Sequence, residues 1–96
     1  MNDFIFDWDK DKNKANIKKH GISFIEAATV FNDARALYSY DAEHSYDEDR
    51  FNVIGFSNTS KLLVVCHCYK ENDTIIRIIS ARKATNNEET LYGGTL

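Results

Sequence analysis

Three β-compatible segments follow one another in the second half of the chain, and they limit the possible folds more than any other feature. They cover residues 51–56, 61–69 and 74–81, and the sequences between them, Ser-Asn-Thr-Ser and Lys-Glu-Asn-Asp, are typical of turns. Strands joined by such short connections pair antiparallel, because a parallel pair needs a long crossover. The sequence therefore predicts an antiparallel meander.

The first half of the chain predicts helices. Residues 10–20 are rich in helix formers, and Gly21 is a favoured residue just after a helix end. Ser23 and Glu26 have the spacing of a capping box and open a second helix, which Asn32-Asp33 ends. Its apolar side chains share one face: Phe24, Ala27, Ala28 and Phe31.

Shorter elements complete the order. Residues 4–6 and 36–40 predict two further strands, and Thr85 with Glu88 repeats the capping-box spacing before a last helix that Gly93 can end. The resulting order is β-α-α-β-β-β-β-α. It is typical of one α+β domain, residues 1–96, in which an antiparallel sheet of about four to five strands carries the two N-terminal helices on one face.

Composition narrows the class of protein. Hydrophobic residues make up 43% of the 96-residue chain, which is enough for one compact core. No apolar run approaches the roughly 20 residues that cross a bilayer. The first residues also lack the basic and apolar stretches of an export signal. We therefore expect a cytoplasmic protein without a membrane anchor, whose two cysteines are reduced thiols.

The sequence Cys66-His67-Cys68 suggests a metal or redox site. On a strand, however, the two cysteines point to one side and His67 to the other, so the three cannot bind one ion. We therefore expect no metal and no cofactor. A small metal-binding or redox domain is the alternative, which metal analysis of the purified chain would test. His44 and His67 otherwise stand alone in the sequence pattern.

The charges are segregated along the chain. The net charge of −3 argues against binding of nucleic acid over the whole surface, since such proteins are usually basic. Residues 10–19 hold five lysines, whereas residues 41–49 hold five acids and neither Lys nor Arg. Any contact with nucleic acid must therefore be local.

Two arginines leave the apolar strand that ends at the last helix. Strict alternation over residues 74–82 places Arg77 and Arg82 on opposite faces. A guanidinium must be paired or solvated, so a structural ion pair, for example with Glu48, is one interpretation. The other is that Arg82-Lys83 faces an anion, because the N-terminus of the following helix attracts phosphate.

Two more polar segments allow both a structural and a catalytic interpretation. Glu48 could act as a general base and Arg50 could stabilise a phosphorane-like transition state, or the acidic loop that holds them could simply be solvated. Lys18, Lys19 and His20 could cap the end of the first helix. Alternatively, the lysines contact phosphate and the histidine acts as a general acid or base.

Many short motifs occur in order along nearly the whole chain. They are Phe6-Asp7-Trp8-Asp9, Asn13, Asn16, Lys19-His20-Gly21, Phe24-x-Glu26-Ala27, Phe31-x-Asp33, Glu48-x-Arg50, Gly55, Ile76-Arg77-Ile78-Ile79-Ser80-Ala81-Arg82-Lys83-Ala84-Thr85, Glu88 and Tyr92. Together they resemble the BrnT family of ribonuclease toxins from type II toxin-antitoxin pairs. The resemblance implies a RelE-like fold, RNA cleavage that blocks translation, and a BrnA-type antitoxin as partner. It also implies a toxin-antitoxin heterotetramer, in which only the antitoxin touches operator DNA and represses the shared operon.

The resemblance also implies a site without a metal. A 2′-hydroxyl attacks the adjacent phosphate while cationic side chains hold the developing charge. The residues predicted to be catalytic are His20, Glu48, Arg50, Arg77 and Arg82, and those predicted to bind RNA are Lys18, Lys19, Lys83 and Tyr92. In this hypothesis Arg50 and Arg82 bind the scissile phosphate, and Glu48 or His20 moves the proton. The alternative is an inactive module of the same fold that acts as antitoxin partner and co-repressor.

Overall fold

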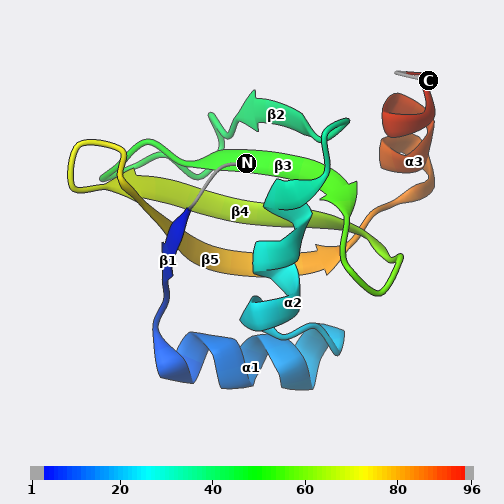
Figure 1. The fold of residues 1–96 in the computed structure, drawn as a ribbon. Helices are drawn as coiled ribbons and strands as arrows, with labels where there is room; N and C mark the ends of the chain where they lie inside the picture. Colours follow the sequence, from blue (N-terminus) through cyan, green and yellow to red (C-terminus); the bar gives the residue numbers. More distant parts are fainter. Residues whose placement is uncertain (1–3, 95–96) are drawn as a thin grey trace.

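The computed structural model describes residues 4–94 as one five-stranded sheet with helices around it (Figure 1). The strands are β1 (Ile5–Asp7), β2 (Leu37–Tyr40), β3 (Phe51–Phe56), β4 (Leu62–Lys70) and β5 (Ile75–Lys83). The helices are α1 (Lys10–His20), α2 (Phe24–Ala28), the 3₁₀ helix η1 (Thr29–Asn32) and α3 (Asn86–Gly93). This order confirms the predicted one, with η1 extending α2. Residues 1–3 and 95–96 of the predicted domain lie outside the described range.

The sheet has the order β1-β5-β4-β3-β2. Each of the pairs β2 with β3, β3 with β4 and β4 with β5 is antiparallel, which confirms the predicted meander. Strand β1 is different, because it pairs parallel with β5 and makes the sheet mixed. Most of the chain separates these two strands, so no hairpin fixes the direction of β1.

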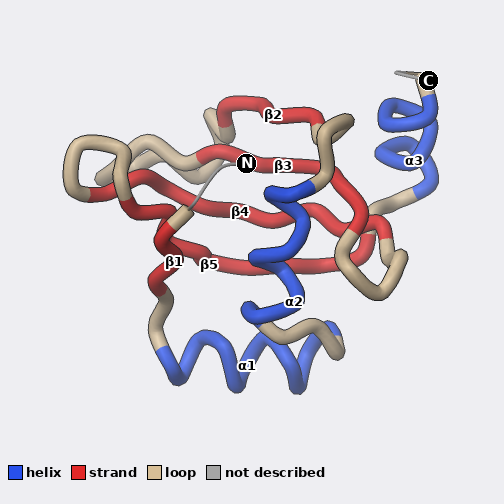
Figure 2. The backbone as a smooth tube through the Cα atoms, in the orientation of Figure 1, coloured by secondary structure: helices blue, strands red, loops and turns tan. Residues whose placement is uncertain are grey.

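The helices cover the sheet unequally. Helix α2 and η1 cross one face, whereas α1 runs along β5 (Figures 1 and 2). Between α2, η1 and the sheet lies the core, which consists of Ile22, Phe24, Ala27, Val30, Phe31, Val53, Leu63, Val65, Ile76, Ile78 and Ala81. Within residues 4–94, no helix lies over the centre of the other face of the sheet (Figure 1). Among residues 4–94, no helix combines the length and apolar character that crossing a bilayer requires.

The caps of the helices follow the predictions with one exception. Gly21 has a φ of 71° and ends α1, and Thr85 and Glu88 form a complete capping box at α3. At α2, the Ser23 side chain accepts from the Glu26 amide as predicted. The predicted return bond, in which the Glu26 side chain accepts from the Ser23 amide, was wrong. The Glu26 carboxylate instead accepts hydrogen bonds from the hydroxyls of Ser57 and Thr59, at 2.8 and 2.6 Å. Glu26 therefore ties α2 to the β3–β4 turn.

Strand β5 contains a β-bulge. Cys66 of β4 is paired with Ser80, but the next residue, His67, is paired with Ile78. Ile79 is therefore an extra residue on β5 with no partner position of its own. A bulge of this kind shifts the alternation of side chains by one residue.

The bulge places Arg77 and Arg82 on the same face of the sheet. Arg77 is paired with Cys68 and Arg82 with Val64, which lie an even number of residues apart on β4. Val65 points the other way, into the core. The two arginines therefore lie on the face away from α2, and the prediction of opposite faces was wrong. Strict alternation fails here because β5 has one more residue than its partner at this point.

Candidate functional site

A cavity of about 260 Å³ lies on the face of the sheet away from α2. Its floor is formed by Asn52, Cys66 and Ser80, which are register partners across β3, β4 and β5. The remaining lining residues are Asp41, Glu43, His44, Arg50, Ile79 and Arg82. The cavity thus brings together two of the predicted catalytic residues, Arg50 and Arg82, from separate parts of the sheet.

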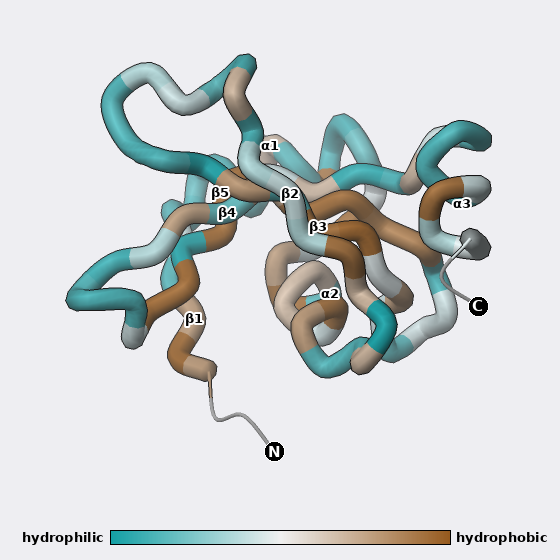
Figure 3. Tube along the Cα trace, turned by 90° about the horizontal axis from the view of Figure 1, so that it is seen from above, coloured by the Kyte–Doolittle hydropathy of each residue, from teal (hydrophilic) through white to brown (hydrophobic). Residues whose placement is uncertain are grey.

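The loop from Asp41 to Arg50 forms one side of this cavity. Seen from above, this hydrophilic loop between β2 and β3 rises on the side of the sheet opposite α2 (Figure 3). The Asp41 amide donates to the Arg50 carbonyl at 2.8 Å, and the Ser45 hydroxyl donates to the Asp41 carbonyl at 2.6 Å. Ser45 Oγ also accepts from the Arg50 amide at 2.9 Å. These bonds close the base of the loop and fix the start of β3.

Arg82 reaches the cavity from the end of β5. Its Nη1 and Nη2 donate to the two carboxylate oxygens of Glu88, at 2.7 and 2.9 Å. The same carboxylate accepts from the Thr85 amide, so Glu88 meets the N-terminus of α3 where a phosphate was expected. A guanidinium has five N–H donors, and the pair with Glu88 therefore leaves donors for a second anion.

Glu88 makes the stability of this corner depend on pH. The hydrogen bond from Arg82 lowers the pKa of Glu88 to about 2, from an ordinary value of 4.5. The ion pair therefore stabilises the fold above about pH 4.5, and this contribution is lost as the pH falls towards 2. We expect Glu88→Gln to lower the melting temperature at pH 7, and the difference from wild type to disappear near pH 2.

Thermal unfolding from pH 2 to 7 measures this effect. Glu89→Gln is the matched control, because Glu89 is the next residue of the helix and is exposed. We expect the control to change the melting temperature much less than Glu88→Gln does. A difference between Glu88→Gln and wild type that stays constant over the whole pH range would contradict the ion-pair argument.

The other predicted ion pairs differ from expectation. Arg77 pairs with Asp7 across the parallel β1–β5 contact, and Arg82 pairs with Glu88. The interpretation that one of these arginines pairs with Glu48 was therefore wrong. Glu48 instead contacts Lys70 Nζ at 2.7 Å and Arg50 Nε at 3.7 Å. The hydrogen bond from Lys70 lowers the pKa of Glu48. Glu48 is therefore a weaker base than an ordinary glutamate.

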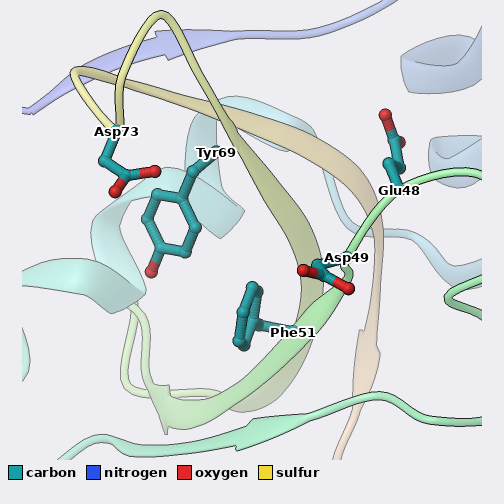
Figure 4. A pocket seen from close by; sticks show the side chains of 5 residues that line it. All are labelled: Glu48, Asp49, Phe51, Tyr69 and Asp73. Carbon is teal, nitrogen blue, oxygen red and sulfur yellow. The ribbon is translucent and has the colours of Figure 1, made fainter.

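Glu48 also lines a second cavity, of about 550 Å³. Its walls combine carboxylates with two aromatic rings, as Figure 4 shows: Glu48, Asp49, Phe51, Tyr69 and Asp73. The rings of Phe51 and Tyr69 meet edge to face, with centroids 5.5 Å apart. Carboxylates repel a phosphate, so the chemistry of this cavity suits a cationic group better than RNA.

The remaining predicted site residues lie outside the smaller cavity: His20, which was predicted to be catalytic, and the four predicted RNA contacts. Lys18, Lys19 and His20 form the C-terminal end of α1, and Lys83 is exposed at the end of β5. Tyr92 is only 6% exposed, and its hydroxyl donates to Asp33 Oδ2 at 2.6 Å. That bond ties α3 to the end of η1, which favours a structural role for Tyr92.

Sequence reasoning missed the histidine in the cavity. His44 Nδ1 lies 2.9 Å from Asp41 Oδ2, and Asp41 is nearly buried, with 9% of its side chain exposed. Burial raises the pKa of Asp41, but hydrogen bonds from His44 and Asn52 outweigh this effect, so the pKa lies below its usual value. The signal in the sequence was the Asp-x-x-His spacing, which gains meaning only when the loop closes.

The cysteine on the cavity floor has little reactivity. Burial and the negative charge of Asp41 raise the pKa of the Cys66 thiol to about 11. A thiol with this pKa is protonated at neutral pH, whereas nucleophiles and metal ligands are thiolates. Cys66 and Cys68 are both free, and among residues 4–94 no three His, Cys, Asp or Glu side chains are arranged to hold a metal ion.

Comparison with known proteins identifies the family. The family model described as "Ribonuclease toxin, BrnT, of type II toxin-antitoxin system" matches residues 8–88. The chain belongs to the BrnT family. A BrnT protein is the toxin of a pair, so an antitoxin is its partner. No curated protein sequence matches the chain.

A solved BrnT structure has the same fold. The crystal structure of the Brucella abortus ribonuclease toxin BrnT superposes with a TM-score of 0.66. The match covers 88% of this chain and 100% of the other, at 22% sequence identity. At this identity the similarity establishes the fold, and it confirms the α+β architecture that the sequence predicted.

Proposed function

We propose that this chain cleaves RNA without a metal ion and thereby inhibits translation, in keeping with its membership of the BrnT family. In the reaction the 2′-hydroxyl of one nucleotide attacks the adjacent phosphate. The observation that carries this proposal is the cavity that Arg50 and Arg82 both line, on the face of the sheet that α2 leaves uncovered. Two guanidinium groups at one cavity can hold both the phosphate and the charge that develops on it.

The surroundings of the two arginines support this reading. Asn52 and Ser80 lie on the cavity floor and offer neutral hydrogen-bonding groups to the nucleotide. The acidic residues of the cavity, Asp41 and Glu43, limit how strongly it attracts any anion. The attraction for phosphate is thus limited to the two arginines of one cavity, which is compatible with a net charge of −3 for the whole chain.

Residues outside the cavity are proposed to hold the rest of the RNA. Lys18, Lys19 and His20 carry exposed or half-exposed side chains at the end of α1. Lys83 follows Arg82, and Arg77 lies on the same face of the sheet as Arg82. Contacts of these side chains with flanking phosphates would position the strand without reading its sequence.

We further propose a BrnA-type antitoxin, a heterotetramer with it, and repression of the operon through the antitoxin alone. The acidic and aromatic cavity beside Glu48 supports a partner with basic side chains, because cations bind both carboxylates and ring faces. An inactive toxin that serves only as co-repressor is the second candidate. The ion pairs that engage Glu48, Arg77 and Arg82 in the protein itself favour it.

Expression of the chain with and without its antitoxin separates the two candidates. We expect the chain alone to arrest growth, and the purified chain to cleave RNA in the presence of EDTA. The products should end in a 2′,3′-cyclic phosphate and a 5′-hydroxyl, and an oligonucleotide with 2′-deoxyribose at the cleavage site should remain intact. If the chain without antitoxin leaves RNA intact, the co-repressor function is correct instead.

A further inference from the structure

His44 lies at the same cavity as the two arginines of the proposed site, although the sequence pattern assigned no function to this histidine. Its ring is 55% exposed, whereas the Asp41 side chain that it contacts is 9% exposed. The contact thus joins a nearly buried carboxylate to an imidazole that solvent can reach. A histidine held by a carboxylate is a recurrent arrangement for proton transfer.

The contact fixes which nitrogen of the imidazole is available. Both oxygens of Asp41 lie within hydrogen-bonding distance of Nδ1, at 2.9 and 3.1 Å. An ionised carboxylate only accepts hydrogen bonds, so Nδ1 carries the proton and Nε2 keeps its lone pair. Within residues 4–94, no protein group hydrogen-bonds to Nε2. Nε2 is therefore able to accept a proton from a bound molecule.

Asp41 is itself held from several sides. Its amide donates to the Arg50 carbonyl, its carboxylate interacts with the Asn52 side chain, and the Cys66 thiol lies 4.0 Å from Oδ2. The same closed loop base fixes both His44 and Arg50. The imidazole and the guanidinium are thus presented to the cavity by one hydrogen-bonded unit.

The other charged or titratable groups at the cavity are poorer bases. They are Arg50, Arg82, Cys66, Glu43 and Asp41. Arginines stay protonated in proteins, and the pKa of Cys66 is raised to about 11. Asp41 is engaged with His44. Glu43 is exposed, and no hydrogen bond or ion pair within residues 4–94 orients it.

We propose that His44 is the general base of the RNA cleavage reaction and that Asp41 is its positioning residue; this inference rests on the proposed ribonuclease function. Nε2 of His44 takes the proton of the 2′-hydroxyl as the 2′-oxygen forms its bond to phosphorus. The bond from phosphorus to the 5′-oxygen breaks, and the 5′-oxygen leaves with a proton from water. The imidazolium then returns its proton to solvent. Arg50 and Arg82 hold the phosphate oxygens throughout.

The test measures cleavage of an oligoribonucleotide by the purified full chain at several pH values. We expect His44→Gln to lower kcat about 100- to 10,000-fold, the usual contribution of a general base, with KM nearly unchanged. The wild-type rate should rise with pH, because a general base acts in its unprotonated form, and the variant should lose that rise. His44→Ala should regain activity when imidazole is added, which a purely structural role would not allow.

Further variants separate the roles of the neighbouring residues. Asp41→Asn should lower kcat less than His44→Gln and alter the pH profile, because it removes the orientation of the ring and leaves the ring in place. Asp47→Asn is the matched control, since Asp47 is exposed in the same loop and lines neither cavity. We expect it to cleave at the wild-type rate.

Two outcomes would overturn the inference without touching the proposed function. One is a wild-type enzyme that cleaves RNA while His44→Gln has the same kcat and pH profile. The other is a loss of activity in Glu43→Gln but not in His44→Gln, which would make Glu43 the base. A wild-type chain that cleaves no RNA would instead refute the proposed function itself.

Discussion

Arg82→Ala is expected to lower kcat for RNA cleavage by about 100- to 1,000-fold and to abolish growth arrest in cells that lack the antitoxin. This is the usual cost of removing one donor that stabilises the charge of a transition state. Arg82 combines a place at the cavity with a guanidinium that the bond to Glu88 holds in a fixed orientation. The measurement is single-turnover cleavage of a labelled oligoribonucleotide, together with growth after induction.

Two variants show whether a loss comes from chemistry or from folding. Glu88→Gln removes the same ion pair but keeps Arg82, so it should lose stability as Arg82→Ala does and retain much more activity. Arg35→Ala is the matched control, because Arg35 is exposed and lines neither the cavity that holds Arg50 and Arg82 nor the cavity beside Glu48. It should be close to wild type in both assays. Cleavage by Arg82→Ala within a few-fold of wild type would remove Arg82 from the site.

Asn16→Ala is expected to lower the free energy of unfolding by about 3 kcal/mol, because each of three buried backbone groups would lose its partner at about 1 kcal/mol or more. Asn16 is 7% exposed. Its Nδ2 donates to the carbonyls of Ile22 and Ala81, both at 2.8 Å, and its Oδ1 accepts from the Ala81 amide at 3.1 Å. The amide thus completes β5 beyond the end of β1 and fastens α1 to it.

Urea denaturation at neutral pH measures this loss. Asn87→Ala provides the comparison, since Asn87 is exposed and has no side-chain hydrogen bond in the described part of the chain. It should change the free energy of unfolding by less than about 0.5 kcal/mol. A loss below about 1 kcal/mol for Asn16→Ala would indicate that water replaces the amide at the strand edge.

Local rules were sufficient for most of the fold. Short turns predicted the meander, because two strands joined by a few residues have one feasible direction. Gly21 and the Thr85-Glu88 pair predicted helix ends, because each satisfies backbone groups within a few residues. Sequence patterns made Arg50 and Arg82 separate candidates, the resemblance to BrnT proteins predicted that they share one site, and both line the same cavity.

Features that depend on distant contacts could not be predicted in this way. Strand β1 joins β5 from the far end of the sequence, and the partner of Arg77, Asp7, follows from that pairing. The role of His44 depends on how a ten-residue loop closes over Asn52 and Cys66, which periodicity does not describe. The carboxylate of Glu26 was expected at its own helix, but hydroxyls of a turn outcompete the local amide.

The bulge at Ile79 means that the layout of this surface is encoded by a count of residues and not by the chemistry of any one of them. Ile76 and Ile78 before it and Ala81 after it are all held in the core, so the strand has to take up one surplus position between them. A polar residue in place of Ile79 should therefore leave Arg77 and Arg82 on the same face of the sheet. Inserting one residue after Ser80 would shift the alternation again. Either Ala81 would then leave the core, or Arg82 would no longer share a face with Arg77. In β5, an insertion or a deletion should therefore disturb this surface more than a substitution does.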